Sequence, residues 1–413
     1  MKITSLEVLG LREPVSTSRS WWSTTPLDVL HEPTEPRLQR RQPGAERGEP
    51  ISNVVVVIHA EDGTYGLGTV GVGSPVAISV ISHHLADLVV GSDAFETERT
   101  WNTMHRNTIA LGRKGIVMEA ISAIDIALWD LKAKLIGQPV YNLLGGRVKQ
   151  TIRAYASELY AREDLESLHR EATALRNAGF SAVKMRFGYG PAEGRAGMRA
   201  NQDLVRTVRE AVGDDVDIAA EAYMGWDTAY AIRMINSLDE YGLAWIEEPV
   251  LPDNLQSYAY VRSRVGVPIS GGEHEFGLTG FRDMIEAGAV DILQPDVNRM
   301  GGITEAAKVW ALAEAYDIPV IPHSNQAHNA HLIASHYSSP LIEVFPEPGV
   351  EAGYNFYQRF FDGEPRAHGG TVVLGGSPGL GLTLVPGVIN AHLAVRKQFG
   401  RTPPDLLAQE LSA

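Results

Sequence analysis

Residues 217–249 read DIAAEAYMGWDTAYAIRMINSLDEYGLAWIEEP. A short β-rich run ends at Glu221, an amphipathic segment follows, and a second β-rich run ends at Glu247. Two strand-like runs separated by a helical segment are typical of a parallel βαβ unit. The stretch therefore predicts two neighbouring parallel strands, each with a glutamate at its carboxyl end.

The same alternation extends to both sides of this stretch. Eight β-rich runs occur in total, at residues 152–157, 182–187, 217–221, 244–247, 268–271, 291–294, 319–322 and 341–344. Helical segments separate them, for example at residues 164–179, 202–212, 304–316 and 330–336. Eight alternating units predict an α/β fold with a closed barrel of the TIM type.

The first 145 residues have a different, mixed pattern. Residues 1–10 alternate like a strand, and residues 53–60 and 65–70 predict a hairpin around an Asp-Gly turn. Helices are expected near residues 76–90, 94–107 and 115–135. After residue 346 the chain is rich in glycine, and one strand is expected at 371–374.

Residues 31–50 contain four prolines and little apolar content. A loop of this length in a compact protein is either a surface loop or a functional lid. Trp21 and Trp22 stand beside it and would give a lid its apolar contacts. The sequence leaves both interpretations open.

The composition excludes several classes of function. Lys and Arg total 36 and Asp and Glu total 50, so the net charge is −14, which disfavours nucleic acid as a partner. No cysteine is present, so thiolate metal sites, disulfides and Cys nucleophiles are excluded. No apolar run reaches the ~18 residues of a membrane span, and the N-terminus does not resemble a signal peptide. We therefore expect a cytoplasmic protein that does not bind membranes.

Carboxylates follow three consecutive predicted strands. Glu221, Glu247 and Glu273 are spaced 26 residues apart, and the carboxyl ends of barrel strands meet at one rim, where active sites lie. Converging carboxylates repel one another unless a cation lies between them. Oxygen ligands without thiolates favour Mg²⁺, with Mn²⁺ as the second choice. The alternative is three separate carboxylates, each paired with a surface Lys or Arg.

Asp296 and His323 follow the next two predicted strands. A carboxylate beside an imidazole fixes its tautomer and raises its basicity, so the pair predicts a general base. A buried structural histidine is the alternative. His274 directly follows Glu273 and could donate a proton to a substrate, whereas His331 lies in a predicted helix and is expected to be structural.

Two further rim positions carry charge. Lys184 and Arg186 share one face of the second predicted strand, because strand side chains alternate. Glu343 lies on the eighth. These residues add both signs of charge to the same end of the barrel.

Residues 66–71 read GLGTVG and match the G-x-G-x-x-G pattern of dinucleotide sites. That motif requires a preceding strand and a helix that opens within it. Here the glycines fall within or after a hairpin strand, and Pro75 precedes the next helix. We expect no nucleotide site.

Several stretches together resemble one known family, the mandelate racemase subgroup of the enolase superfamily. Within it the chain is most similar to the L-rhamnonate dehydratase-like acid-sugar dehydratases. The stretches are AISAIDIALWDLKAKLIGQPVYNLLGG at 120–146, KMRFGYGP at 184–191, WIEEP at 245–249, GGEHE at 271–275, LQPDVNRMGGIT at 293–304, IPHSN at 321–325 and PGLGL at 378–382.

The resemblance implies an α+β cap built from both termini over a modified (β/α)₇β barrel. It places the cap at residues 1–145, with a lid loop near 16–50, the catalytic barrel at 146–345, and a C-terminal segment at 346–413 that returns to the cap. It also implies a homo-oligomer.

For the site, the resemblance makes the three rim glutamates ligands of Mg²⁺ and the Asp296–His323 pair the base dyad. Glu343 matches an acid that hydrogen-bonds the substrate carboxylate, and Lys184 matches the first basic position of the second strand. Two departures stand out. Glu221 replaces the usual Asp, and Arg186 replaces a Lys that serves racemases as a base. A guanidinium stays protonated, so it is a poor proton acceptor.

The implied reaction is dehydration of a small anionic sugar acid, an aldonate such as L-rhamnonate, to a 2-keto-3-deoxy acid through an enediolate. His323 would take the C2 proton, and His323 or His274 would protonate the leaving hydroxyl. Trp21, Trp22 and Tyr189 suggest apolar contact with a 6-deoxy sugar. An epimerase, racemase or cycloisomerase with Lys184 as a second base is the enzymatic alternative, and a non-catalytic binding protein is another.

Overall fold

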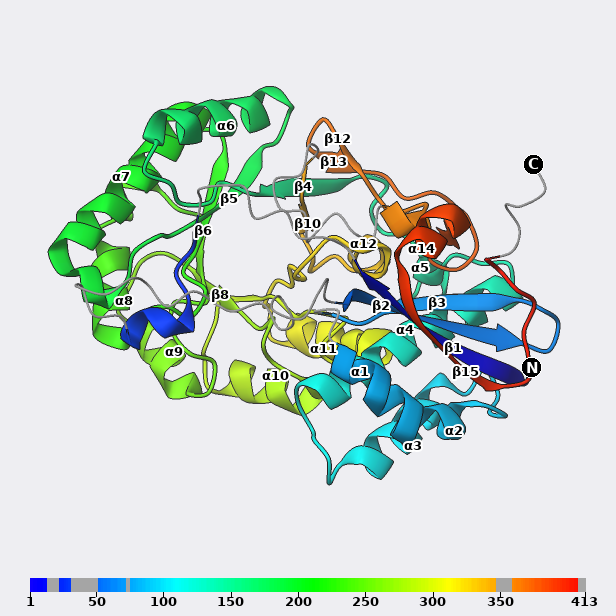
Figure 1. The fold of residues 1–413 in the computed structure, drawn as a ribbon. Helices are drawn as coiled ribbons and strands as arrows, with labels where there is room; N and C mark the ends of the chain where they lie inside the picture. The colour runs from blue at the N-terminus through cyan, green and yellow to red at the C-terminus, as the bar shows by residue number, and fades with distance from the viewer. Residues whose placement is uncertain (13–21, 31–50, 72–74, 347–358, 408–413) are drawn as a thin grey trace.

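The computed structural model describes residues 1–12, 22–30, 51–71, 75–346 and 359–407 (Figure 1). The parts of the expected lid at 16–21 and 31–50 lie outside them, as does Trp21.

The central sheet is a ring of parallel strands, and it confirms the predicted barrel class. Its strands are β4 (Ile152–Ser157), β5 (Ala182–Arg186), β6 (Asp217–Glu221), β7 (Trp245–Glu247), β8 (Ile269–Gly271), β9 (Ile292–Leu293) and β10 (Leu341–Val344). β4 to β9 pair in this order and β10 pairs with β4, whereas no strand pairing joins β9 to β10 among the described residues. The expected strand at 319–322 is reduced to a parallel bridge between Leu293 and Val320. The Val320 N–H also donates to Ser338 O at 3.1 Å, which links this segment to the chain entering β10.

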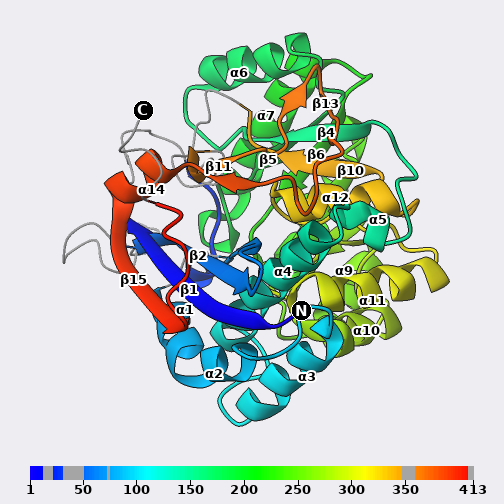
Figure 2. The same cartoon turned by 90° about the vertical axis from the view of Figure 1, so that its right-hand side faces the viewer.

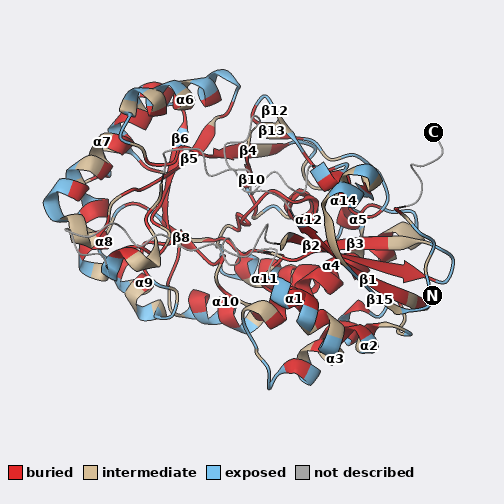
Figure 3. Cartoon of the chain, in the orientation of Figure 1, coloured by how far each residue is buried: buried red, intermediate tan, exposed pale blue. Residues whose placement is uncertain are grey.

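Helices cover the outside of this ring (Figure 1). They are α6 (Leu165–Asn177), α7 (Gly194–Val212), α8 (Thr228–Asn236), α9 (Leu255–Arg262), α10 (Gly277–Glu286), α11 (Gly302–Ala315) and α12 (Ala327–Ser335). The inner faces of α6 to α10 are buried and their outer faces largely exposed, whereas α12 is buried along its whole length (Figure 3). The predicted helix at 202–212 begins earlier, at Gly194, after a 3₁₀ turn over Pro191–Glu193.

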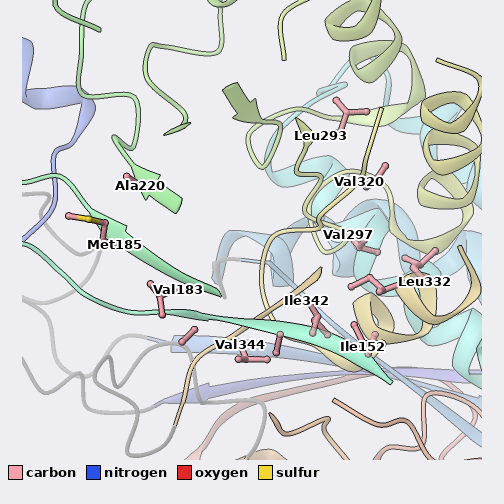
Figure 4. Packing of buried hydrophobic residues seen from close by; sticks show 14 of the residues in the cluster. Ile152, Val183, Met185, Ala220, Leu293, Val297, Val320, Leu332, Ile342 and Val344 are labelled. Carbon is pink, nitrogen blue, oxygen red and sulfur yellow. The ribbon is translucent and has the colours of Figure 1, made fainter. Parts of the chain in front are cut away.

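Alternation along the strands sorts side chains to two sides of the ring. Val183 and Met185 of β5 belong to the large core between strands and helices, with Ile342 and Val344 of β10 (Figure 4). The opposite faces form a small inner core, whose members are Tyr155, Ala182, Ala219, Trp245, Ile321 and Leu341. Both faces are buried, as expected for a parallel sheet covered by helices.

The cap is an antiparallel sheet in the order β15-β1-β2-β3, packed against helices. Its strands are β1 (Ile3–Arg12), β2 (Ile51–Ala60), β3 (Tyr65–Thr69) and β15 (Leu393–Gly400), and its helical segments are α1 (Pro75–Val80), a π turn (Ile81–Leu85), α2 (Ala86–Val89), α3 (Thr97–Thr108) and α4 (Ile116–Leu135). The hairpin and the three helical regions are therefore where the sequence placed them. β15, which was not expected, lies along β1 (Figure 2).

The remaining elements are short. They are a 3₁₀ turn (Pro26–Leu30), α5 (Val140–Leu143), β11 (Phe361–Asp362), β12 (Ala367–His368), β13 (Thr371–Val372), β14 (Thr383–Leu384) and α14 (Pro386–His392). β13 is the strand expected at 371–374, and it pairs with β4. Among the described helices, none is both long and apolar enough to cross a membrane.

Two of the three glycines of the 66–71 motif, Gly66 and Gly68, make room for α4. A Cβ on Gly66 would lie 2.1 Å from Ala127 O, and one on Gly68 would lie 2.0 Å from Ala123 O. Both positions must lack a side chain for the helix to approach β3 this closely. Helix packing thus accounts for these glycines without a nucleotide.

Candidate active site

Charged side chains lie at the carboxyl end of the ring, two residues further along the strands than the inner-core residues. Lys184, Glu221, Glu247, His323 and Glu343 each stand two residues after an inner-core residue. Side chains two apart point to the same face of a strand. Each of these segments has an apolar residue followed two positions later by a charged or titratable one. The apolar side chains therefore fill the barrel interior, and the charged ones line its carboxyl end.

The three predicted metal ligands meet. Glu221 ends β6, Glu247 ends β7, and Glu273 follows β8. Each offers a carboxylate oxygen, and these oxygens lie within 4.8 Å of one another. All three residues are almost fully buried. Registry explains the meeting of the first two, because Glu221 and Glu247 are direct neighbours in the paired strands.

Lys184 lies among these acids. Its Nζ is 2.7 Å from Glu247 Oε1, 3.0 Å from Glu343 Oε1 and 3.3 Å from Glu221 Oε2. Burial alone would lower the pKa of Lys184, but the surrounding carboxylates outweigh it and hold that pKa well above its usual value. Lys184 is therefore a fixed positive charge.

The acids in this cluster outnumber the nearby cations, and the pKa of one acid, Glu247, is raised as a result. Burial and its acidic neighbours raise the pKa of Glu247 to about 7, although Lys184 opposes the change. Glu343 behaves differently: burial alone would raise its pKa, but Lys184, His323 and the hydrogen bonds from Ser157 and Ser324 together lower it to about 2. An ionised Glu343 accepts hydrogen bonds, as it does from the Ser324 N–H at 2.5 Å. A negative substrate group would then meet Lys184 more favourably than Glu343.

Arg186 is held against the end of β4. Its Nη1 donates to Glu158 O at 3.1 Å and its Nη2 to Ser157 Oγ at 3.2 Å. Its Nε lies 3.3 Å from Glu221 Oε2, and the guanidinium lies over the Tyr160 ring at 4.2 Å. These contacts fix Arg186 beside the first of the three glutamates.

The predicted dyad is formed. His323 Nδ1 lies 2.8 Å from Asp296 Oδ2, and His323 Nε2 lies 3.6 Å from Glu273 Oε2. Burial disfavours the charged ring, but Glu273 and Asp296 outweigh it and raise the pKa of His323 to about 9. The ring thus turns Nδ1 to its orienting acid and Nε2 to the carboxylate cluster. A cation on Glu273 would offset the largest charge that raises this pKa, and the neutral ring would then have the geometry of a proton acceptor.

His274 also reaches this end of the barrel, with a partner that sequence reasoning missed. Its Nδ1 lies 2.9 Å from Glu248 Oε1, and it is 3.7 Å from Glu273 Oε1. Strand alternation would turn Glu248 away from the barrel interior. Glu248 instead has a left-handed φ of 43° directly after β7, and this turn returns its side chain to the rim.

Arg299 is the second residue that was missed. Its Nη1 lies 3.3 Å from Glu273 Oε1, and its Nε lies 3.2 Å from Asp296 Oδ2. It therefore joins the carboxylate cluster to the dyad. The available signal was its position three residues after Asp296, a spacing that brings side chains together in a turn.

Trp22 and Tyr189 lie at the same end of the barrel. Trp22 Nε1 donates to Gly188 O at 3.0 Å, and the two rings meet edge to face at 6.1 Å. Thr24 fastens this segment to the barrel, because its Oγ1 donates to Ala222 O at 2.6 Å. His331 has a structural contact, accepting the Tyr141 N–H at 3.1 Å.

An α+β cap over a barrel, with acids, a lysine and a His–Asp pair at the carboxyl ends of its strands, defines a two-domain barrel enzyme. Residues 47–145 match the mandelate racemase / muconate lactonizing enzyme N-terminal domain, and residues 167–388 match the enolase C-terminal domain-like family. The chain belongs to the enolase superfamily.

Three similar proteins carry more specific names. An L-rhamnonate dehydratase of Saccharopolyspora erythraea is 37% identical over 341 residues, which are 82% of this chain and 84% of that protein. The structure of rhamnonate dehydratase from Gibberella zeae complexed with Mg has a TM-score of 0.82 at 30% identity, covering 95% of this chain and 96% of that one. The 3,6-anhydro-D-galactonate cycloisomerase from Zobellia galactanivorans has a TM-score of 0.78 at 27% identity, covering 96% and 100%.

Proposed function

We propose that this enzyme is a hydro-lyase that removes water from an aldonic acid, with L-rhamnonate as the first candidate, and forms a 2-keto-3-deoxy acid. The names of the similar dehydratases support the class of reaction. The observation that carries the proposal is an asymmetry around the carboxylates. His323 with Asp296 offers a base on one side, whereas Arg186, which stays protonated, is fixed on β5. One base suits dehydration, and racemisation requires two.

A divalent cation fits the three glutamates. Their oxygens lie within 4.8 Å of one another in a buried setting, and hard carboxylate oxygens are the ligands that Mg²⁺ and Mn²⁺ prefer. We propose that Glu221, Glu247 and Glu273 hold Mg²⁺, with Mn²⁺ as a substitute. The bound ion would supply positive charge against the negative charge that develops on the substrate carboxylate when its α proton leaves.

The protein side chains would divide the remaining work. His323 Nε2 takes the C2 proton while Asp296 holds the opposite ring nitrogen. Lys184 stabilises negative charge on the substrate carboxylate. The C3–O bond then breaks, and a proton from His323, or from His274 braced by Glu248, completes the departing water. The resulting enol becomes the keto acid in solution.

The extent of the domains and the assembly belong to the proposal as well. We assign residues 1–145 and 346–413 to the cap and residues 146–345 to the barrel, and the pairing of β15 with β1 supports this division. Trp22 and Tyr189 would border the apolar end of the sugar acid. The homo-oligomer and the cytoplasmic location remain predictions.

Proton NMR in D₂O tests the reaction. The enzyme is incubated with Mg²⁺ and a panel of aldonic and aldaric acids. New C3 signals from a substrate in the panel are expected, because dehydration converts C3 from a carbinol to a methylene carbon. Loss of the C2 proton signal alone would favour the epimerase or racemase alternative. No change with any acid would favour a non-catalytic protein.

A further inference from the structure

The residue after His323 has an uncommon backbone conformation. Ser324 is buried and has a φ of 75°, in the left-handed region that side chains other than glycine rarely occupy. Such a conformation costs about 1–3 kcal/mol and persists only where neighbouring groups enforce it. The groups that enforce it therefore also set the direction in which His323 leaves the backbone.

The Asn329 side chain supplies part of that restraint. Its Nδ2 donates to His323 O at 2.8 Å and to Ser324 O at 2.9 Å. The side chain is fully buried, and its Oδ1 accepts no hydrogen bond within the described part of the chain. The amide thus acts as a double donor to two consecutive carbonyls of the turn.

The support beneath Asn329 is rigid. It lies in the first turn of α12, a helix in which all nine residues are buried. The Ala327 N–H at the start of this helix donates to the Glu364 carboxylate at 2.9 Å, so the C-terminal segment anchors the helix. On the other side of the turn, the Ser324 N–H donates to Glu343, which contacts Lys184.

We propose that Asn329 is a positioning residue: it holds the strained His323–Ser324 turn so that the His323 ring reaches Asp296 with Nε2 facing the carboxylates. The inference rests on the proposed function in taking His323 as the base. It also gives a reason for an amide at this position. Carbonyl oxygens need donors, and a carboxylate of the same shape would repel them.

A double-mutant cycle separates this role from simple packing. We expect Asn329→Ala to lower kcat about 100-fold with KM changed less than about threefold, because a misplaced base affects the chemical step. Ser324→Gly in that background should restore kcat about tenfold relative to Asn329→Ala alone, since glycine adopts the turn without strain. Failure of Ser324→Gly to restore any activity, or a normal kcat in Asn329→Ala, would overturn the proposal.

Ser335→Ala is the matched control in the same helix. Ser335 Oγ lies 3.0 Å from the carbonyl oxygens of both His331 and Leu332, at the opposite end of the helix from Asn329, and can donate its one proton to either. The kcat of the Ser335→Ala variant should stay within about twofold of the wild-type value, which is the error of such an assay. A loss of kcat in Ser335→Ala as large as that in Asn329→Ala would reduce Asn329 to a generic helix contact and contradict the proposal.

A readout without turnover keeps the two proposals distinguishable. In protein with ¹⁵N-labelled histidine, the His323 ring signals are assigned through His323→Asn. Asn329→Ala should shift these ring signals. Adding Ser324→Gly to Asn329→Ala should return the signals toward their wild-type positions. Unshifted ring signals would contradict the positioning role even if an acid is dehydrated. If no acid is turned over, the same spectra still test the turn.

Discussion

The two ends of the barrel solve the same problem, a left-handed turn, with different residues. At the amino ends, four turns from helix to strand have glycine at positive φ, namely Gly179, Gly213, Gly242 and Gly288, and a fifth has Asp317. At the carboxyl ends, Gly272 has positive φ, but so do five residues with side chains, Leu159, Tyr223, Met224, Glu248 and Ser324. Glycine is the inexpensive choice for such a turn. The carboxyl end therefore retains side chains at a cost in conformational energy.

The two ends of the barrel have different roles: the turns at the amino end serve the fold, and those at the carboxyl end also place functional side chains. The amino end needs only to reverse the chain, and glycine does so without strain. The carboxyl end must aim specific groups, such as Glu248 toward His274 and His323 toward Asp296. Strain stored at a functional site is tolerated because the surrounding structure over-determines it. Changes at the two ends should therefore affect different measurements.

The largest effect is expected at the base. His323→Asn should lower kcat by about 10⁴-fold, because the ring is the proposed proton acceptor. Binding of Mg²⁺ or Mn²⁺, measured by calorimetry, should stay near the wild-type value, since His323 is not among the three glutamates. Turnover close to wild type in this variant would contradict the assignment of the base. It would also contradict the expectation that substitutions at the carboxyl end affect catalysis more than those at the amino end.

A buried cation at the carboxyl end should dominate stability there. Lys184→Met leaves Glu221, Glu247 and Glu343 without their shared counter-ion, and we expect it to lower the free energy of unfolding by about 3–5 kcal/mol in the absence of divalent ions. Arg170→Met is the matched control, because Arg170 is an exposed partner of the exposed Glu166. Its loss should be below ~1 kcal/mol. Equal losses in urea denaturation would refute the central role of Lys184.

The pH dependence of stability sharpens the comparison through Glu364. Burial raises its pKa to about 8, against the stabilising N–H of Ala327. The unfolded chain ionises this group near pH 4–5 but the folded chain does not, so its contribution to stability falls as pH rises from about 5 to 8. Glu364→Gln keeps an acceptor for Ala327 and removes the charge. We expect it to unfold like wild type at pH 5 and to be more stable by about 1–3 kcal/mol at pH 8.

Thermal unfolding at the two pH values decides this point. A stability difference between Glu364→Gln and wild type that is independent of pH would show that the carboxyl group is ionised in the folded protein.

The smallest effects are expected at the amino end. Gly242 has a φ of 58° with open space around it, so Gly242→Ala should cost about 1 kcal/mol. Asp317 is the exposed residue with positive φ at this end, and Asp317→Gly should add about 0.5 kcal/mol. Both variants should keep kcat and KM within about twofold of wild type. A large loss of kcat in either variant would contradict the expectation that turns at the amino end do not affect catalysis.

The sequence predicted most of what periodicity and strand polarity control. Alternation along short runs located the strands, and the polar residue at each run's end located Glu221, Glu247, Asp296 and His323. The same reasoning could not find Glu248, because alternation assigns it to the wrong face and only a left-handed turn returns it.

Two other features depend on contacts between distant segments. β15 forms because the free edge of β1 accepts it, and its own sequence LAVRKQFG carries no turn or strand boundary signal. The expected strand at 319–322 is reduced to one bridge at Val320 because the segment pairs with a single residue of β9, Leu293. Such pairings are decided by tertiary structure rather than by local preference.

The central claim is that three glutamates at the carboxyl end hold a divalent cation beside His323. Anomalous diffraction from crystals grown with Mn²⁺ tests it directly. We expect one peak bounded by oxygens of Glu221, Glu247 and Glu273. A second possible group of ligands, formed by Glu248, Glu273 and His274, lies next to it. A peak among those residues, or no peak at this end of the barrel, would contradict the claim.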